Sequence, residues 1–146
     1  MKLPKVLWIL VFLLVSCASV PMGTDAENQA ALTFTPPAGT ANVYIIRRPA
    51  YAGAAILATT TLDTQMTGGL KAGSFILKTV EPGTHTVTVF SNENQASLPF
   101  TAEAGRNYFF DVKSEMGIVS ARFSIHPMST ADGEEGTKRC KITQRL

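Results

Sequence analysis

Short β-type runs separated by turn signals fill residues 41–127, and this pattern constrains the fold more than any other feature. In one run Tyr108, Phe110 and Val112 fall on a single face, because they occupy every second position. Alternation with a period of two indicates a strand that buries one face. No amphipathic helix of ten residues is visible. Runs of this length and spacing predict an all-β fold, a single-domain antiparallel β-sandwich of immunoglobulin-like or small-barrel type.

Turn residues divide this stretch into its expected strands. Glu81-Pro82-Gly83 and Ala104-Gly105-Arg106 are strong turn signals, and Gly68-Gly69 marks a further turn. Pro99 has no backbone N–H and therefore predicts an edge strand or a bulge. The strands are expected at 42–48, 56–62, 74–80, 84–90, 98–101, 108–112 and 119–125.

The first twenty residues have the pattern of an export signal. Lys2 and Lys5 precede an apolar run at 6–15, which is well short of the ~20 residues that span a bilayer as a helix. The run ends in Leu14-Val15-Ser16-Cys17. This motif resembles a bacterial lipobox, in which Leu14, Val15 and Ser16 are recognised by the signal peptidase and Cys17 becomes the lipidated first residue. The alternatives are a secretory peptide cut after Ala18 and an uncleaved anchor.

This interpretation sets the expected organisation of the chain. Residues 1–16 are a cleaved signal peptide, and 17–40, rich in small residues, proline and glycine, is a lipidated N-terminus and flexible tether. The β-sandwich occupies 41–127. Residues 128–146 are a polar tail that either ends in one further strand or stays loose. Because residue 18 is alanine and not aspartate, the motif resembles that of an outer-membrane lipoprotein facing the periplasm.

The charge balance excludes some classes of binding partner. The chain has 13 basic and 11 acidic residues, and removal of Lys2 and Lys5 leaves a net charge of zero. Neither nucleic acid nor a strongly basic membrane-binding face is therefore expected.

Cys140 is the only thiol besides Cys17, so no internal disulfide is predicted. We expect Cys140 to be a buried or harmless thiol. The alternative is a mixed or intermolecular disulfide, which its cationic neighbours would favour by lowering its pKa.

Several short motifs occur in an order that carries a family resemblance. They are Val43-Tyr44-Ile45-Ile46-Arg47, Glu81-Pro82-Gly83-Thr84-His85 and Ala104-Gly105-Arg106-Asn107-Tyr108-Phe109. Together they resemble the bacterial lipoprotein family catalogued as domain of unknown function 2846, over about residues 41–127. The resemblance implies a secreted or lipid-anchored β domain and brings no known catalytic residues.

The residues themselves indicate no catalytic, cofactor or metal site. His85 follows a turn, and we expect it to bond that turn, because a metal site needs three or four ligands and only one other histidine exists. His126 is expected to be solvated. The serines lack a glycine-flanked nucleophile turn. Acidic residues are scattered near turns, and nothing in the sequence selects a pair among Asp63, Glu81, Glu93, Glu103, Asp111 and Glu115.

Three features could form binding surfaces. Alternation places Arg47 and Arg48 on opposite faces of a strand end, so a solvated terminus is favoured over an anion-binding patch. One of the two arginines could pair with an acidic turn. Tyr44, Tyr51 and Tyr108 either form a binding surface or line the core. The unpaired edges of a sandwich offer a route to partner binding by strand addition.

The resulting prediction is a non-enzymatic, lipid-anchored envelope protein that acts as an interaction or accessory module. Its partners are the membrane, through the N-terminal lipid, and an envelope protein bound at an edge strand; no cofactor is expected. The alternatives are a binder of an unknown small molecule, an envelope enzyme with an unrecognised site, and a structural lipoprotein without a specific ligand. A pocket with converging polar residues would favour the first two alternatives.

Overall fold

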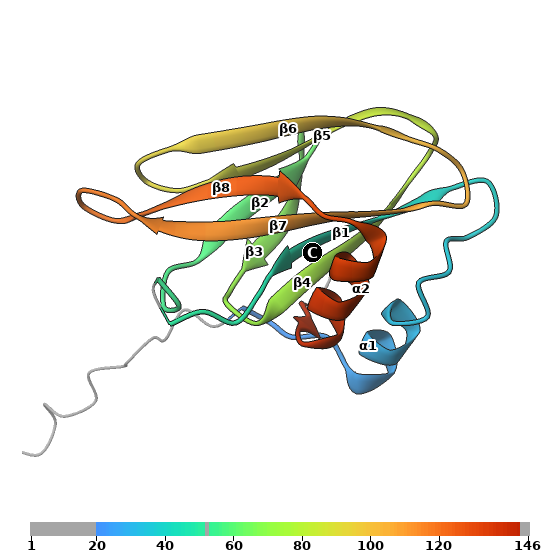
Figure 1. The fold of residues 1–146 in the computed structure, drawn as a ribbon, viewed down its shortest axis with the longest axis horizontal. Helices are drawn as coiled ribbons and strands as arrows, with labels where there is room; N and C mark the ends of the chain where they lie inside the picture. Colours follow the sequence, from blue (N-terminus) through green and yellow to red (C-terminus); the bar gives the residue numbers. More distant parts are fainter. Residues whose placement is uncertain (1–19, 52, 144–146) are drawn as a thin grey trace, which may run out of the picture.

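The computed structural model describes residues 20–51 and 53–143, which form two packed β-sheets and two short helices (Figure 1). One sheet is mixed, in the order β8-β7-β1-β4-β9, and the other is antiparallel, in the order β3-β2-β5-β6. The residues Leu14, Val15, Ser16 and Cys17, to which the lipobox prediction belongs, lie outside the described part. The elements are α1 (Asp25–Ala31), β1 (Ala41–Arg47), β2 (Ala58–Leu62), β3 (Gln65–Leu70), β4 (Ser74–Val80), β5 (Gly83–Phe90), β6 (Gln95–Ala102), β7 (Asn107–Met116), β8 (Ala121–Pro127), α2 (Thr130–Lys138) and β9 (Lys141–Ile142).

The mostly-β prediction is confirmed, but the chain is not wholly antiparallel. β1 pairs in parallel with β7, and β4 pairs in parallel with β9. All seven residues of β1 are buried, because the second sheet covers one face and the helices cover the other. A strand buried on both faces has a continuous apolar run, as 43–46 does, and that pattern is typical of parallel pairing.

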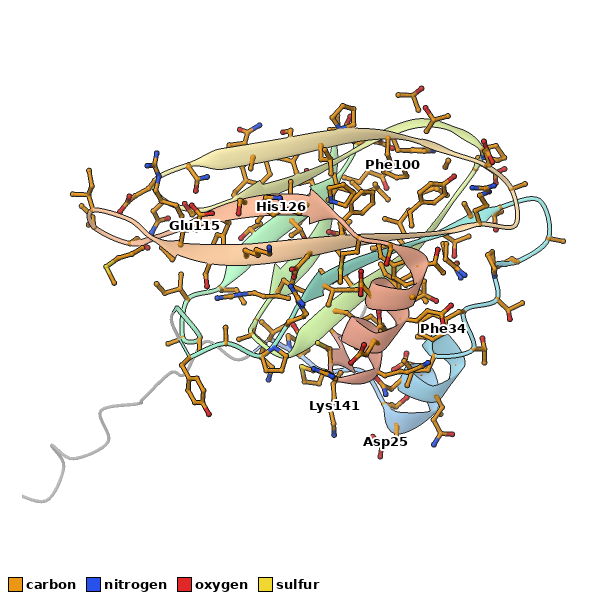
Figure 2. All side chains as sticks on the ribbon, in the orientation of Figure 1. Asp25, Phe34, Phe100, Glu115, His126 and Lys141 are labelled. Carbon is orange, nitrogen blue, oxygen red and sulfur yellow. The ribbon has the colours of Figure 1, made fainter. Side chains whose placement is uncertain are left out.

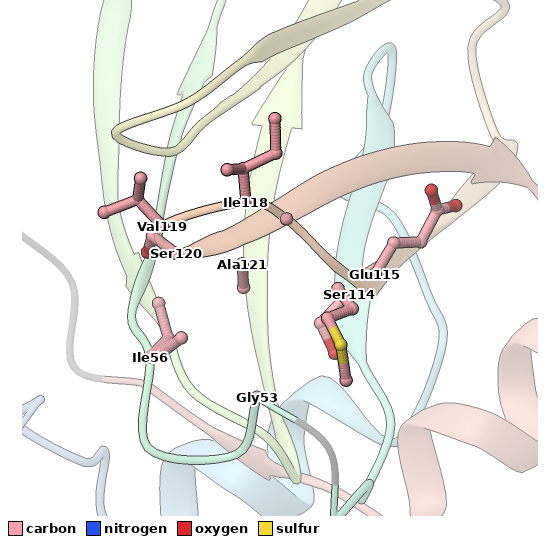
Figure 3. Close-up of a pocket in the computed structure, with 10 residues that line it drawn as sticks. Gly53, Ile56, Ser114, Glu115, Ile118, Val119, Ser120 and Ala121 are labelled. Atoms are coloured by element: carbon pink, nitrogen blue, oxygen red, sulfur yellow. The ribbon is translucent and has the colours of Figure 1, made fainter.

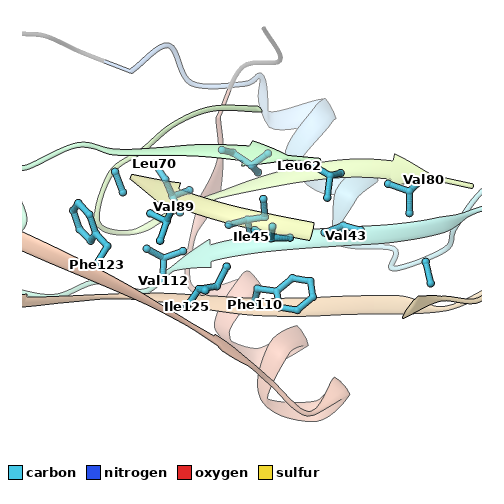
Figure 4. Close-up of a cluster of buried hydrophobic side chains, with 14 of the residues drawn as sticks. Val43, Ile45, Leu62, Leu70, Val80, Val89, Phe110, Val112, Phe123 and Ile125 are labelled. Carbon is cyan, nitrogen blue, oxygen red and sulfur yellow. The ribbon is translucent and has the colours of Figure 1, made fainter. Parts of the chain in front are cut away.

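The main core lies between the two sheets (Figure 4). Val43 and Ile45 of β1 face Val87 and Val89 of β5 across it, and Phe100 packs against its rim (Figure 2). Burial of such side chains contributes roughly 1.5–3 kcal/mol each, so this layer supplies most of the stabilisation. Its other large members are Leu62, Leu70, Ile76, Val80, Phe110, Val112, Phe123 and Ile125.

A second core lies between the mixed sheet and the helices. Tyr44 stacks on Phe109 with ring centroids 4.8 Å apart, and both rings are buried with Ile46 and Phe75. The Tyr44 hydroxyl donates a hydrogen bond to the carbonyl of Ala31, at 2.8 Å, and so fixes the end of α1. Burial raises the pKa of Tyr44 to about 12. Tyr44 is thus a core residue and not part of a binding surface.

The structure differs from the expected flexible tether at 17–40, because the described part of that segment is folded onto the domain. Thr24 caps α1 in a reciprocal capping box with Glu27, which stabilises even this short helix. Met22 forms a bridge with Thr143, and Asn107 donates a hydrogen bond to the carbonyl of Phe34. The described chain is therefore attached to the domain from Met22 onwards.

The tail at 128–146 contains the further strand, β9, and also a helix that the sequence analysis did not expect. Ser129 caps α2 by accepting a hydrogen bond from the Asp132 amide. Gly133 and Gly136 lie on the buried side of α2, and at Gly133 the absence of a side chain lets the helix approach Phe109 of the sheet closely. The stretch 132–136 had the composition of a loop, but tertiary packing outweighs the low helix propensity of its two glycines.

The turn between β2 and β3 is also made by residues other than those expected. Gly68-Gly69, expected as a turn, lies within β3 beside a bulge in its pairing with β2. The turn is made instead by Asp63 and Thr64, and Asp63 has a positive φ of 56°. Aspartate tolerates this left-handed conformation better than most residues. The position of Pro99 is confirmed, since β6 forms an edge of the antiparallel sheet.

Candidate functional site

Two loops meet at one end of the sandwich and form the most distinctive surface of the described chain. The loop 48–57 connects β1 to β2, and the turn 117–120 connects β7 to β8. They enclose an open cavity of about 330 Å³ (Figure 3). Its walls include Gly53 and Ile56 from the first loop and Ile118, Val119 and Ala121 from the hairpin.

These loops also carry the exposed apolar side chains. Six large apolar side chains are exposed in the described part of the chain, and five of them belong to this end; the sixth is Met66 in β3. We call the five the apolar end: Tyr51, Leu57, Met116, Ile118 and Val119. Met116, Ile118 and Val119 are each at least 90% exposed. Single exposed apolar residues are normal, but a cluster of this kind indicates an interaction site.

The hairpin turn is held by Glu93 from the β5–β6 loop. The Glu93 carboxylate accepts hydrogen bonds from the backbone amides of Ile118, Val119 and Ser120. These bonds hold the pKa of Glu93 below its ordinary value. A Cβ on Gly117 would lie 2.1 Å from the Ser120 carbonyl oxygen and 2.4 Å from a Glu93 carboxylate oxygen, so only glycine fits.

Asn94 fixes the base of the same hairpin. Its amide group donates to the Phe123 carbonyl at 2.7 Å, and its side-chain oxygen accepts from the Phe123 amide at 2.9 Å. Asn94 therefore bonds β8 as a neighbouring strand would. Sequence reasoning missed the roles of Glu93 and Asn94, whose partners lie more than 24 residues away. The signal that marks the apolar end is the absence of charge in 49–62 and 116–121.

A buried arginine supports the loop 48–57 through hydrogen bonds to its backbone. The Arg47 side chain is 1% exposed and points between the sheets, over the ring of Phe123 at 4.9 Å. Its guanidinium donates to the carbonyls of Gly53, at 2.6 Å, and Leu70, at 3.1 Å, and also to that of Ile56. Burial lowers the pKa of Arg47. The expected solvated strand end is wrong for Arg47, because its parity matches that of the core residues of β1.

Arg48 lies on the opposite face and is half-exposed. It binds the buried carboxylate of Asp111, with 2.5 Å between Nη2 and Oδ2, and this hydrogen bond raises the pKa of Arg48. Its acidic partner lies in strand β7 and not in a turn. The two arginines therefore do not form one patch. This confirms the prediction, made from their alternation, that they lie on opposite faces.

His85 has the structural role that its place after a turn predicted. Its Nε2 lies 2.8 Å from the Glu81 carbonyl, and its Nδ1 lies 2.9 Å from Oδ2 of Asp63. The other carboxylate oxygen of Asp63 accepts from the Thr86 amide. Because both ring nitrogens face acceptors, the protonated imidazolium is the form that satisfies both contacts. The hydrogen bond that His85 donates to Asp63 raises the pKa of His85, and the same bond lowers the pKa of Asp63.

This pair gives stability a specific pH dependence. Because the folded-state pKa of His85 is raised, its contribution is complete below the unfolded-state value of about 6.5 and is lost as the pH rises through the folded-state pKa. We expect the loss of unfolding free energy between pH 6 and pH 9 to be about 0.5–1 kcal/mol smaller in Asp63→Asn than in the native chain, since Asp63 is half-exposed. Asparagine keeps the left-handed turn. Urea unfolding at both pH values measures this difference, and equal losses in the two proteins would refute the coupling.

The other candidate residues have separate roles. Cys140 is buried, its thiol lies 3.7 Å from the Arg47 carbonyl, and burial raises its pKa to about 11. The buried position of Cys140 is therefore confirmed, and the lowering of its pKa expected from cationic neighbours is outweighed by burial. His126 is exposed, as expected. The Tyr108 hydroxyl accepts from the Glu103 amide at 2.9 Å, whereas Tyr51 is fully exposed.

The acidic residues are distributed over different partners. Glu103 pairs with Arg106, at 3.0 Å, and Glu115 accepts a hydrogen bond from Ser124. Within the described residues, no three side chains of the metal-ligating types come together. No helix in residues 20–51 and 53–143 is long and apolar enough to cross a membrane.

The fold and the apolar end thus define a β-sandwich domain with a candidate interaction surface at one end of its sheets. A family model described as a protein of unknown function (DUF2846) matches residues 37–125, more than half of the chain. The chain therefore belongs to the DUF2846 family. It is also similar to an uncharacterised protein of Haemophilus influenzae, with 26% identity over 131 residues that cover 89% of this chain and 77% of the relative.

Proposed function

We propose that this DUF2846 protein is a lipid-anchored protein of the cell envelope whose β-sandwich acts as a non-enzymatic interaction module. The outer membrane, on its periplasmic side, is the proposed location. The observation that carries the proposal is the apolar end, where five exposed apolar side chains are held on two loops by Arg47 and Glu93. Rigid loops with exposed apolar residues are typical of binding surfaces.

The N-terminal sequence supports the anchor. Cys17 follows the apolar run 6–15 directly, at the position of a lipidated cysteine. Three peptide bonds separate it from Val20, and such a segment reaches at most ~11 Å when fully extended. Met22 and α1 are attached to the domain itself. A lipid on Cys17 would therefore hold the domain close to the bilayer instead of on a long tether.

The bonding of the titratable groups supports a non-enzymatic role. Both nitrogens of His85 are engaged within the domain, and Asp111 is committed to Arg48. A general base must be within reach of a substrate proton and must itself be free to accept it. The carboxylate of Glu93 is likewise occupied by three backbone amides.

Binding of a small molecule is a second candidate, because the cavity at the apolar end has a volume of about 330 Å³. This is near the lower end of the range for ligand pockets. A saturable rise in melting temperature with a medium-chain hydrocarbon ligand would favour this candidate. The interaction module predicts no such rise.

The anchor is tested by Cys17→Ala in cells supplied with labelled palmitate. We expect complete loss of the label and accumulation of an unprocessed or soluble chain, because the sulfur that carries the lipid is gone. Cys140→Ala is the matched control and should keep the full label, since that thiol is buried in the fold. Gel fluorography and intact mass measure both results. Continued processing and membrane attachment of Cys17→Ala would show that the anchor is wrongly assigned.

A further inference from the structure

We propose that the apolar end docks on the phospholipid surface to which the chain is anchored, and that Ile118 and Val119 enter the boundary between headgroups and acyl chains. This inference rests on the proposed lipid anchor and adds a second contact to it. The occupant is the bilayer, and the contact is hydrophobic, since the mature chain has 11 basic and 11 acidic residues and no net charge to attract it to anionic lipid.

The composition of the two loops suits a lipid boundary. Residues 49–62 and 116–121 contain no charged side chain, and the nearest charges on the hairpin are Glu115 and Arg122. Met116, Ile118 and Val119 project from the turn between them and are almost fully exposed. Tyr51, on the neighbouring loop, is also fully exposed, and tyrosine is enriched where apolar and aqueous phases meet.

The backbone amides of the hairpin turn are hydrogen-bonded within the protein, as a medium of low polarity requires. A turn normally leaves amide groups that need water, and each unpaired group costs several kcal/mol in hydrocarbon. Here the amides of Ile118, Val119 and Ser120 are bonded to Glu93. The Glu93 carboxylate lies at the turn itself, where these three amides hold it, so the insertion of the side chains at 118 and 119 must be shallow and leave the carboxylate at the level of the headgroups.

The length of the N-terminal segment favours lipid over another occupant. The backbone of Cys17 can lie at most ~11 Å from that of Val20, and the described chain is attached to the domain from Met22. Tethering at this distance converts the docking of a weak apolar surface into an intramolecular event. A bilayer is therefore always within reach of the apolar end, whereas a protein partner or a second copy must first arrive by diffusion.

The sequence supplies a clean spectroscopic test. Its one tryptophan, Trp8, lies in the predicted leader, so a tryptophan placed in the mature chain is a sole reporter. Ile118→Trp reports on the hairpin. Met66→Trp is the matched control, because Met66 is 61% exposed and pairs near the far end of β2, away from the loop 48–57. Both sites are exposed, so both variants should fold. Circular dichroism and the melting temperature of each variant check that it does.

The acylated variants are reconstituted in vesicles of phosphatidylethanolamine and phosphatidylglycerol with brominated acyl chains. We expect brominated lipid to quench the fluorescence of Ile118→Trp about twofold or more, with a blue-shifted emission, and to leave that of Met66→Trp unchanged. Adding Val119→Asp to Ile118→Trp should return the quenching to the level of the Met66→Trp control, because a charge beside the reporter opposes insertion.

Three results would overturn the proposal. One is equal or absent quenching at positions 118 and 66 in protein whose intact mass shows the acyl group, and that result leaves the anchor standing. Another is a blue shift of the Ile118→Trp emission that needs no lipid and grows with protein concentration, which would assign the apolar end to a second copy. A mature chain without acyl mass refutes the anchor and the docking that rests on it, and the mass spectrum distinguishes this failure from the other two.

Discussion

Arg47→Ala should lower the free energy of unfolding by about 3–5 kcal/mol, the largest effect we expect from any single substitution in this protein. Alanine removes the donors that serve the carbonyls of Gly53, Ile56 and Leu70, and it leaves a cavity where the largest fully buried side chain lay. Each unpaired buried carbonyl costs roughly 1–3 kcal/mol, and the cavity adds to this. Urea unfolding followed by circular dichroism measures the change.

Two further variants test this explanation. Arg47→Met keeps most of the volume but no donor, so it should recover only the cavity part of the loss. Arg106→Ala is the control for removal of an arginine, because its pair with Glu103 is about two-thirds exposed and should change stability by less than about 0.5 kcal/mol. A loss in Arg47→Ala below about 1 kcal/mol would show that water or other groups replace the guanidinium.

Arg47 also connects stability to the apolar end. Two of its three acceptors, Gly53 and Ile56, belong to the loop that carries Tyr51. Loss of these bonds should therefore release the loop 48–57 before the sheets separate, as faster amide hydrogen exchange at Ala54 and Ile56. The amide of Phe123, bonded by Asn94 on the hairpin side, should keep its protection.

Most of the strands could be predicted from the sequence, because strand patterns are local; β3 was missed because Gly68-Gly69 has the pattern of a turn. Alternation in 108–112 and the threonine-rich run 84–90 correspond to β7 and β5. His85 could be assigned to its turn because Glu81 lies only four residues away. The pairing of strands is not local, and nothing in the alternation distinguishes the parallel contact between β1 and β7.

The candidate site was harder to predict because its parts come from distant segments. Arg47 had the position of a strand-end cation, and its burial depends on carbonyls from the loop 48–57 and from β3. Glu93 and the hairpin turn are more than 24 residues apart. The helices were not predicted for two other reasons. α1 has only seven residues and was hidden among turn residues, whereas α2 contains two glycines, and packing against Phe109, not propensity, makes it helical.

Gly133→Ala and Gly136→Ala should change stability in opposite directions, although both exchange a glycine for alanine in α2. A Cβ on Gly133 would lie 2.2 Å from Cγ of Phe109, whose buried ring is stacked on Tyr44 and has no room to move. The resulting overpacking should cost about 1–3 kcal/mol. A Cβ on Gly136 would meet its nearest neighbour, Cε of Met128, at 3.5 Å, which is an ordinary contact.

Gly136→Ala should therefore leave stability unchanged or raise it by up to about 1 kcal/mol, through the better helix propensity of alanine. Thermal and urea unfolding of the two variants measure the contrast. In a Phe109→Leu background the cost of Gly133→Ala should shrink, because the smaller side chain leaves space for the methyl group. Equal effects of the two alanines in the native background would contradict the close approach of α2 to β7, and would mean that the glycines act only through the unfolded chain.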